Sequence, residues 1–320
     1  MSKREQVISE ASPADTGGVS ASRPGHMLSF DVEEYFQVEA AAARLPAGDW
    51  ERWPARVEPA IHQILELLDE HRVKATFFVL DWIARRRPEI VRRIASAGHE
   101  IASHGVSHRM LQVMTPQEFR AELAESRRRL EDLCGQPVVG FRAPTFSITL
   151  RTSWALDILA EMGFRYDSSV FPIRHDRYGV PDAPRWAHWA LGPGGGRIIE
   201  IPPLVLRIAR WNLPVGGGGY LRLLPVGLVA CALRKAEQAG RSGMIYVHPW
   251  EFDPGQPVLP MSRVSRWRHR VGLARTEGKL RRLLRQFAFH PVRDLLPSLG
   301  MAQAQEYSYA DCGKAPAAGG

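Results

Sequence analysis

The succession of apolar segments predicts a single α/β domain built around a parallel sheet. Short apolar runs bounded by polar residues, which are typical of buried strands, alternate about seven times with longer segments whose apolar residues recur at helical spacing. Between residues 27 and 300 no stretch has the composition of a domain linker, and no repeat period stands out. The alternation leaves two architectures open, a closed barrel and a doubly wound sheet.

Each predicted element follows from its own local signal. A helix after Thr115, for example, is predicted because Thr115 and Glu118 form a capping-box pattern, and Gly135 ends it. Residues 36–53 suggest a mixed loop or short helix, and residues 292–296 a last strand or helical turn. The predicted strands are 27–32, 75–80, 99–105, 138–142, 165–167, 198–201 and 244–248, and the predicted helices are 56–70, 88–97, 116–134, 152–162, 225–239 and 269–287.

The length and composition are those of a globular protein with an ample core. The chain has 320 residues, of which 45% are hydrophobic and 24% charged. Residues 1–26 are rich in Ser, Ala, Gly and charged residues, and the chain ends in small and polar residues. We therefore expect a disordered N-terminal extension over 1–26, one domain over 27–300 and a mostly disordered tail over 301–320.

The basic charge balance does not by itself indicate a nucleic-acid partner. Lys and Arg number 42 against 34 Asp and Glu, which gives a net charge of +8. Much of this excess is arginine in helix-like segments, whose outer faces are normally solvated. No basic motif interleaved with aromatic residues and no zinc-finger spacing is present. We expect no nucleic-acid partner.

The spacing of the cysteines and the lack of long apolar runs indicate the cellular location that we expect. Three widely separated cysteines, Cys134, Cys231 and Cys312, argue against a disulfide framework and fit a reducing compartment. The N-terminal residues lack the apolar core of a secretory signal, and no run of about 18 apolar residues could span a membrane. We expect a cytoplasmic protein that can act close to the membrane. The oligomeric state is left open by the sequence.

Residues able to bind metals or move protons recur where the predicted strands end. In parallel α/β folds the carboxyl ends of the strands meet at the edge that carries the chemistry. Surface residues scattered at random would not fall repeatedly at such positions. The residues concerned are Asp31 and Glu33, His104 and His108, Arg142, Asp167 and His248.

Three of these positions indicate a metal site. Asp31 and Glu33 are two apart, so on an extended chain they point to the same face, whereas Glu34 points away. Two converging acids need a metal or a shared proton. His104 and His108 are four apart and would share one face of a helical turn. Two imidazoles and a carboxylate form an open site for zinc or a similar divalent ion.

The other positions suggest charge partners. A buried Arg142 would pair with Asp31 and keep it ionised, although pairing with a solvated helix carboxylate is the alternative. Asp167 could raise the pKa of His248, which would suit a general acid; a purely structural histidine is the alternative. The four glycines of 216–219 form either a flexible turn or a close backbone approach to a ligand.

Taken in order, these motifs resemble those of the NodB-homology polysaccharide deacetylases, the carbohydrate esterase 4 family. The resemblance covers about residues 27–290. It implies a distorted (β/α)7 barrel and metal-dependent removal of N-acetyl groups from sugars. The motifs that carry it are Ser29–Glu33, Ala75–Val79, His104 with His108, Arg142–Pro144, Tyr166–Ser169 and Val247–Trp250.

The resemblance assigns a role to each site residue. Asp31 is similar to the catalytic base, and Arg142 to the residue that orients it. His104 and His108 are similar to the metal ligands. His248 is similar to the general acid, with Asp167 as the acidic residue associated with it.

One position departs from the family. Its usual motif has adjacent aspartates, the base and then a metal ligand, but Val32 occupies the second place here. Valine cannot bind a metal, so we expect Glu33 to be the third ligand. Related branches of the family use an Asp-x-Asp spacing.

The implied activity is hydrolysis of the N-acetyl group of a sugar in a poly- or oligosaccharide. Motifs at 167–173, 216–220 and 248–251 resemble the branch associated with exosortase and PEP-CTERM loci, which implies exopolysaccharide biosynthesis. The implied cofactor is a divalent metal ion, with zinc expected, and Trp250 and Tyr220 are expected to shape the sugar cleft. Two alternatives stay open: a metal-dependent amidohydrolase on a small cyclic amide or imide, and a non-catalytic carbohydrate-binding assembly protein.

Overall fold

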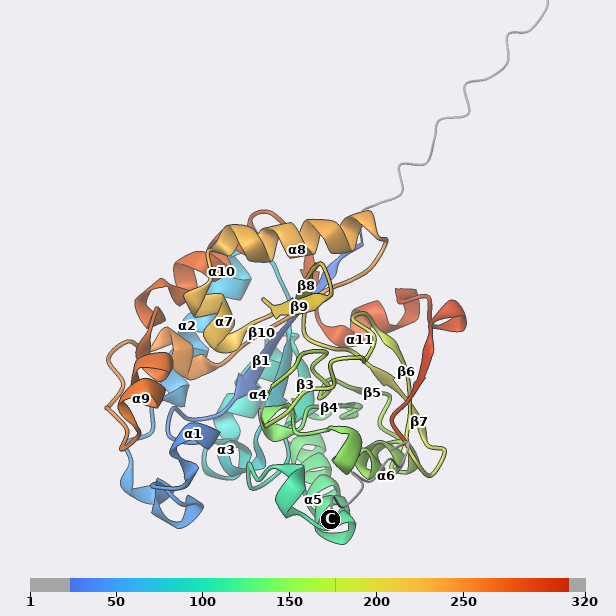
Figure 1. Cartoon of the computed structure of the whole chain (residues 1–320). Coiled ribbons are helices and arrows are strands. Elements are labelled where there is room, and N and C mark those ends of the chain that lie inside the picture. The colour runs from blue at the N-terminus through green and yellow to red at the C-terminus, as the bar shows by residue number, and fades with distance from the viewer. Residues whose placement is uncertain (1–23, 176, 311–320) are drawn as a thin grey trace, which may run out of the picture.

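The structure, a computed structural model, describes residues 24–175 and 177–310. Helices surround a central sheet (Figure 1). The strands are β1 His26–Val32, β2 Thr76–Val79, β3 Glu100–Ser103, β4 Gly140–Phe141, β5 Tyr166–Asp167, β6 His188–Leu191, β7 Arg197–Glu200, β8 Val205–Ile208, β9 Trp211–Pro214, β10 Met244–Val247, β11 Phe289–His290 and β12 Glu306–Ser308. The helices are α1 Glu39–Ala42, α2 Val57–Glu70, α3 Asp81–Arg86, α4 Pro88–Ser96, α5 Pro116–Cys134, α6 Trp154–Glu161, α7 Gly218–Leu223, α8 Val226–Gln238, α9 Arg263–Arg270, α10 Thr276–Leu284 and α11 Val292–Leu295.

The predicted α/β fold with a parallel sheet is confirmed, and the sheet curves into a distorted barrel. Strands β10, β1, β2, β3, β4, β5 and β7 lie side by side in that order, and each neighbouring pair is parallel. The chain just after β7 returns to β10 through the isolated bridge of Pro203 with Met244. This bridge closes the ring with far fewer hydrogen bonds than a regular strand pair would supply.

Strand β1 lies between β10 and β2 in the ring and is buried along its whole length. Leu28, Phe30 and Val32 belong to the core cluster formed with helices such as α2. Met27 packs inside the ring with Phe78 of β2. Because side chains alternate along a strand, Ser29 and Asp31 also face the interior, whereas Val32 points away from it.

The predicted helix over 269–287 was wrong, because the chain breaks there into α9 and α10. The break lies at Gly272, whose φ of +74° is the left-handed conformation that favours glycine. A Cβ at Gly272 would lie 2.8 Å from the carbonyl oxygen of Arg222. The close approach to α7 therefore requires both the glycine and the interruption of the helix.

The ordered fold extends past residue 300, where we expected the domain to end. Strand β12 pairs in parallel with β6, and Tyr309 is buried. The rest of the expected tail, and residues 1–23 of the expected N-terminal extension, lie outside the described residues. Within the described ranges, no helix has the length and apolar character needed to cross a membrane.

Candidate active site

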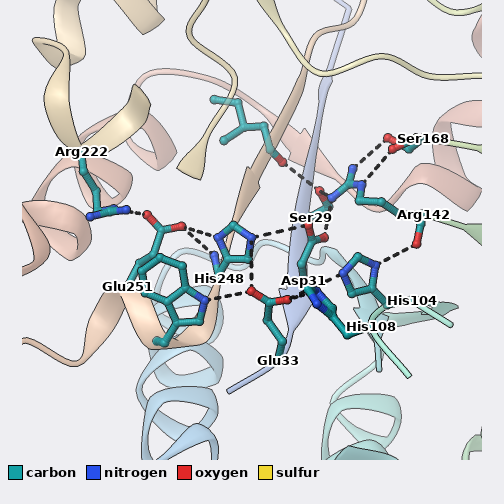
Figure 2. Close-up of polar contacts among 12 residues, drawn as sticks. Ser29, Asp31, Glu33, His104, His108, Arg142, Ser168, Arg222, His248 and Glu251 are labelled. Atoms are coloured by element: carbon teal, nitrogen blue, oxygen red, sulfur yellow. Dashed lines mark hydrogen bonds and ion pairs between the residues drawn. The ribbon is translucent and has the colours of Figure 1, made fainter. Parts of the chain in front are cut away.

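The strand ends surround a cavity of about 770 Å³. Five of the predicted site residues line it: Asp31, Glu33, His104, His108 and His248. Trp250 and Tyr220, expected to shape a sugar cleft, line it as well. Figure 2 shows the carboxylates of Asp31 and Glu33 between His248 on one side and His104 and His108 on the other.

The expected ion pair between Arg142 and Asp31 is present at the floor of the cavity. The two side chains are almost completely buried, and Nη1 of Arg142 lies 2.6 Å from Oδ1 of Asp31. The same guanidinium donates to Oγ of Ser29 at 2.9 Å, to the carbonyl oxygen of Ser168 at 3.1 Å and to its Oγ at 2.8 Å. These bonds fix the guanidinium in one orientation, so the carboxylate of Asp31 is held in one position.

Glu33, His104 and His108 form a compact donor set. One ligand atom from each lies within 4.8 Å of the others, and all three residues are buried. The Nε2 atom of His108 is 2.5 Å from Oε2 of Glu33, and that of His104 is 3.9 Å away. Burial favours a neutral Glu33, but the charges and hydrogen bond of His108, with His248 and His104, lower its pKa below the usual range.

The orientation and the protonation state of His104 suit a metal ligand. Its Nδ1 donates to the carbonyl oxygen of Arg142 at 2.8 Å, which leaves the lone pair on Nε2. Burial lowers the pKa of His104 to about 4, so the ring is neutral at pH 7. A neutral imidazole, a second imidazole and an ionised carboxylate fit a divalent metal ion of intermediate softness.

The two histidines converge through a loop, and not through the helical turn expected from their spacing. Residues 104–108 contain no helix, and Gly105 and His108 have φ values of +77° and +55°. A left-handed conformation at a histidine is strained. With this backbone conformation the imidazole of His108 contacts the carboxylate of Glu33.

Glu34 points away from the cavity, as the alternation along β1 predicts. Its carboxylate accepts backbone N–H bonds from Arg56 at 2.9 and 3.0 Å and from Val57 at 3.1 Å, at the start of α2. These N–H groups have no partner within the helix. Glu34 therefore anchors α2 and is not part of the donor set.

The carboxylate that contacts His248 is Glu251, and not Asp167 as expected. Nδ1 of His248 lies 2.7 Å from Oε1 of Glu251, whose Oε2 accepts from Nε of Arg222 at 2.6 Å (Figure 2). Burial opposes charge on His248, but the hydrogen bond to Glu251 and the charges of Glu33 and Asp31 raise its pKa to about 9. His248 is therefore protonated at pH 7, and its Nε2 lies 3.8 Å from Oδ2 of Asp31.

Asp167 lies behind Arg142, away from the cavity. It accepts from Oγ of Ser169 at 2.5 Å, and that hydroxyl oxygen in turn accepts from the backbone N–H of Ala143 at 2.7 Å. Its neighbour across the strands is Glu200. Burial and the nearby carboxylate of Asp167 raise the pKa of Glu200 well above its usual range.

Trp250 contacts the site as well as lining the cavity. Its indole N–H donates to Oε1 of Glu33 at 3.1 Å, and its ring stacks on that of His248 at 5.1 Å. The glycine segment makes a close backbone approach, but to β10: a side chain at Gly217 would collide with the carbonyl oxygen of Tyr246. The next residues, Gly218 and Gly219, line the cavity.

Sequence reasoning missed Glu251 and Arg222 as parts of the site. The signal for Glu251 was available, since an acid three residues after His248 can reach its ring across a single turn. Arg222 gave no signal, because it lies 29 residues from Glu251 in an otherwise apolar window.

Two family models match the chain. Residues 49–166 match the polysaccharide deacetylase model, and residues 168–297 match a domain of unknown function, DUF3473. The boundary divides the site, because Glu33, His104, His108 and Arg142 precede it whereas Arg222, His248 and Glu251 follow it.

Curated relatives match a limited part of the chain. A chitooligosaccharide deacetylase from Bradyrhizobium sp. is 33% identical over 97 residues, 30% of this chain and 42% of that protein. A peptidoglycan-N-acetylglucosamine deacetylase from Bacillus cereus is 39% identical over 82 residues, 26% of this chain and 30% of that protein. The chain thus spans less than half the length of these relatives.

Solved structures match almost the whole fold. A putative polysaccharide deacetylase from Mycobacterium smegmatis has a TM-score of 0.59 at 21% identity, covering 93% of this chain and 97% of that one. A structure described as Puue allantoinase has a TM-score of 0.53 at 18% identity, covering 89% and 96%. At these identities the likeness shows a shared fold.

Proposed function

We propose that this chain, which is related to the polysaccharide deacetylase family through residues 49–166, is a metal-dependent deacetylase. Its substrate would be an N-acetylated sugar in a poly- or oligosaccharide, and its products acetate and a free amino sugar. One observation carries the proposal: a buried, arginine-held carboxylate lies between a three-residue donor set and a protonated histidine, in one cavity.

Glu33, His104 and His108 would hold the metal ion. A divalent ion there supplies a Lewis acid, which makes water a stronger nucleophile and polarises an amide carbonyl. Trp250 keeps Glu33 in place through its indole N–H bond, and the carbonyl oxygen of Arg142 fixes the ring of His104.

Asp31 is the general base of this scheme. Its Oδ1 atom accepts a hydrogen bond from Arg142. Its Oδ2 atom lies 3.8 Å from Nε2 of His248 and is available to a water. Asp31 takes the proton of the water whose oxygen bonds to the carbonyl carbon. The bond to Arg142 keeps the carboxylate in the orientation that this transfer needs.

His248 is the general acid. The C–N bond breaks as the leaving nitrogen receives the proton from Nε2 of His248, while Glu251 and Arg222 hold the opposite side of the ring. Asp167 is a positioning residue that does not contact the reacting groups. Through Ser169 it fixes the backbone at Ala143, directly after Arg142.

Finer assignments extend this proposal. Zinc is the metal best suited to two imidazoles and one carboxylate in an open site. The role in exopolysaccharide biosynthesis and the branch associated with exosortase and PEP-CTERM loci rest on the sequence motifs. The cytoplasmic or membrane-proximal location rests on the separated cysteines and the lack of long apolar runs. The single domain expected over 27–300 is likewise our proposal.

Mass spectrometry of N-acetylated oligosaccharides incubated with zinc-loaded protein tests the function. We expect loss of acetyl groups with zinc, and none after chelation or in the His104→Ala variant. Hydrolysis of cyclic amides or imides but no glycan would favour the amidohydrolase alternative. Bound metal and glycan without any product would favour the non-catalytic one, and either result would refute the proposal.

A further inference from the structure

Helix α9 carries basic and aromatic residues beside the cavity. Arg268 lines the active-site cavity itself. Arg263, Arg266, Trp267 and Arg270 line a second hollow of about 450 Å³ together with Val271. Because Trp267 and Arg268 are consecutive in the helix, the two hollows lie on adjoining faces of α9. We call the four arginines of α9 and Trp267 the α9 surface.

The arginines of the α9 surface are not tied up in ion pairs. Several arginines on other helices do pair with carboxylates, as Arg127 does with Glu131 at 3.0 Å and Arg281 with Glu70 at 2.5 Å. In the described parts of the chain, no ion pair joins an arginine of α9 to a carboxylate. Arg266 and Arg270 donate to backbone carbonyls, and no hydrogen bond of the Arg263 or Arg268 side chain is found there. Among the described residues, the positive charge of these arginines is thus not taken up by ion pairs.

Trp267 adds a flat apolar face to this charge. Its side chain is 58% exposed, and Val264 one turn earlier is 60% exposed. A tryptophan ring is the largest apolar surface a residue can leave in water, and it stacks well on rings with apolar faces. Arg174, which also lines the active-site cavity, is likewise exposed and without a carboxylate partner among the described residues.

The α9 surface is held rigidly to the reacting groups. Nη1 of Arg222 donates to the carbonyl oxygens of Arg268, His269 and Val271, at the C-terminal end of α9. The same guanidinium donates through Nε to Glu251, which contacts His248. A single buried arginine therefore fixes both the general acid and the helix, and the surface is formed before any ligand binds.

We propose that the substrate is an acidic glycan, bound beyond the reacting sugar by the α9 surface and Arg174. The arginines would bind carboxylates or similar anionic groups on neighbouring sugars, since the planar guanidinium matches a carboxylate in two parallel hydrogen bonds. Trp267 would stack on a sugar ring. The proposal rests on the proposed function and names its substrate class.

The acidic residues of the cavity explain why the arginines that would bind anionic sugars lie beside the reacting groups and not among them. Asp31 and Glu33 occupy its floor, and Glu39 is half-buried in its wall. An anionic group on the reacting sugar would be repelled there, whereas one on a neighbouring sugar would reach α9. An anionic lipid surface also attracts arginine and tryptophan, but Arg268 shares its cavity with His248, which favours the substrate itself as the occupant.

The test compares acidic and neutral oligosaccharides of equal length with the zinc-loaded full chain. Hyaluronan fragments alternate glucuronate with N-acetylglucosamine, and chitin fragments contain only the latter. We expect tighter binding and a higher kcat/KM for the acidic glycan, with an advantage that weakens as salt rises. Equal affinities for the two glycans, or a preference that salt does not change, would overturn the proposal.

A double variant, Arg263→Gln with Arg268→Gln, removes one charge from each hollow without breaking a hydrogen bond of the described residues. We expect the ratio of acidic to neutral affinity, and of the corresponding kcat/KM values, to fall about fivefold to tenfold. The matched control, Arg92→Gln with Arg93→Gln on α4, removes two exposed arginines that line neither hollow, and should leave both ratios unchanged.

The outcomes separate this proposal from the proposed function. If neither glycan loses acetyl groups, the proposed function fails and the affinities still decide the substrate class. If the neutral glycan is hydrolysed and the double variant leaves both ratios unchanged, only the proposal for α9 fails. Loss of binding to phosphatidylglycerol vesicles in the double variant, with unchanged glycan ratios, would assign the surface to a membrane.

Discussion

Individual side chains in this site act through pairs whose members come from distant parts of the sequence. Asp31 and Arg142 are 111 residues apart, yet Nη1 of Arg142 lies 2.6 Å from Oδ1 of Asp31 in the buried floor of the cavity. The pair was predictable because both residues lie at the carboxyl ends of buried strands. The role of Glu251 was not, because choosing between Asp167 and Glu251 depends on which strand-end side chain faces the cavity.

Replacing Arg142 by lysine should separate positioning from charge. Lysine keeps the positive charge but has one nitrogen, which cannot reach Asp31 and Ser168 together as the guanidinium does. We expect kcat/KM to fall about 100-fold through lost orientation of the base, while bound metal stays near one per chain. Turnover and metal content measured on the same sample check this, and a lysine variant with wild-type kcat/KM would contradict it.

Glu251→Gln should shift the pH dependence of activity. The pKa of His248 is raised to about 9, so the protonated acid is present below that pH and is lost as pH rises through it. Removing the negative charge of Glu251 lowers this pKa, and the alkaline limb of kcat/KM should move down by about one to two pH units. An unchanged alkaline limb in a variant that melts cooperatively would show that His248 is not the acid.

At the scale of elements, the parallel strands that carry site residues were predicted well and the C-terminal helices less well. Every strand that carries a site residue was located within two residues, because its apolar run is short and sharply bounded. The break between α9 and α10 was missed, because it depends on the packing of Gly272 against Arg222. The hairpin of β8 and β9 was also missed, since its strands carry exposed arginine and tryptophan.

Two buried histidines that tie strands together should make the fold sensitive to acid. Nδ1 of His26 accepts from the backbone N–H of Gly243 and Nδ1 of His99 from that of Ala75, both at 3.1 Å, so neither nitrogen can carry a proton. Burial lowers the pKa of each to about 4. The stability that they provide is therefore complete above pH 6.5 and is lost as pH falls toward 4.

The His99→Asn variant tests this linkage. The amide oxygen of asparagine can replace Nδ1 as the acceptor without titrating. Between pH 7.5 and 5.5 the free energy of unfolding of the variant should fall by about 1 kcal/mol less than that of the wild type. Urea unfolding at the two pH values gives both quantities, and an identical fall in the two proteins would be incompatible with a neutral His99.

At the scale of the whole molecule, strands from the two matched segments lie in one sheet. Strand β1, which carries Asp31, pairs with β2 on one side and with β10 on the other. The C-terminal matched segment, which contains β10, therefore supplies one of the two neighbours of β1. The same division runs through the site, with the donor set and the base on one side and the acid on the other. Sequence periodicity predicted the α/β class, whereas closure of the ring depends on the bridge of Pro203 with Met244, which no local pattern indicates.

A fragment of residues 24–166 should therefore not fold alone. It lacks β10, β11 and β7, so β1 would expose one edge along its full length, and the core cluster would lose the residues of α8 and α10. We expect no cooperative thermal transition by circular dichroism, in contrast to the full chain. A sharp melt with native-like near-ultraviolet signal would show that the segment is an independent domain.

Metal content and acetate release, measured together on matched variants, test the central claim most directly. Asp31→Asn should keep the metal and lose acetate release, Glu33→Gln should lose both, and Glu34→Gln should keep both while losing stability at α2. This pattern follows from a base at Asp31, a ligand at Glu33 and a helix anchor at Glu34. Acetate release at the wild-type rate from Asp31→Asn, or full metal content in Glu33→Gln, would contradict the account.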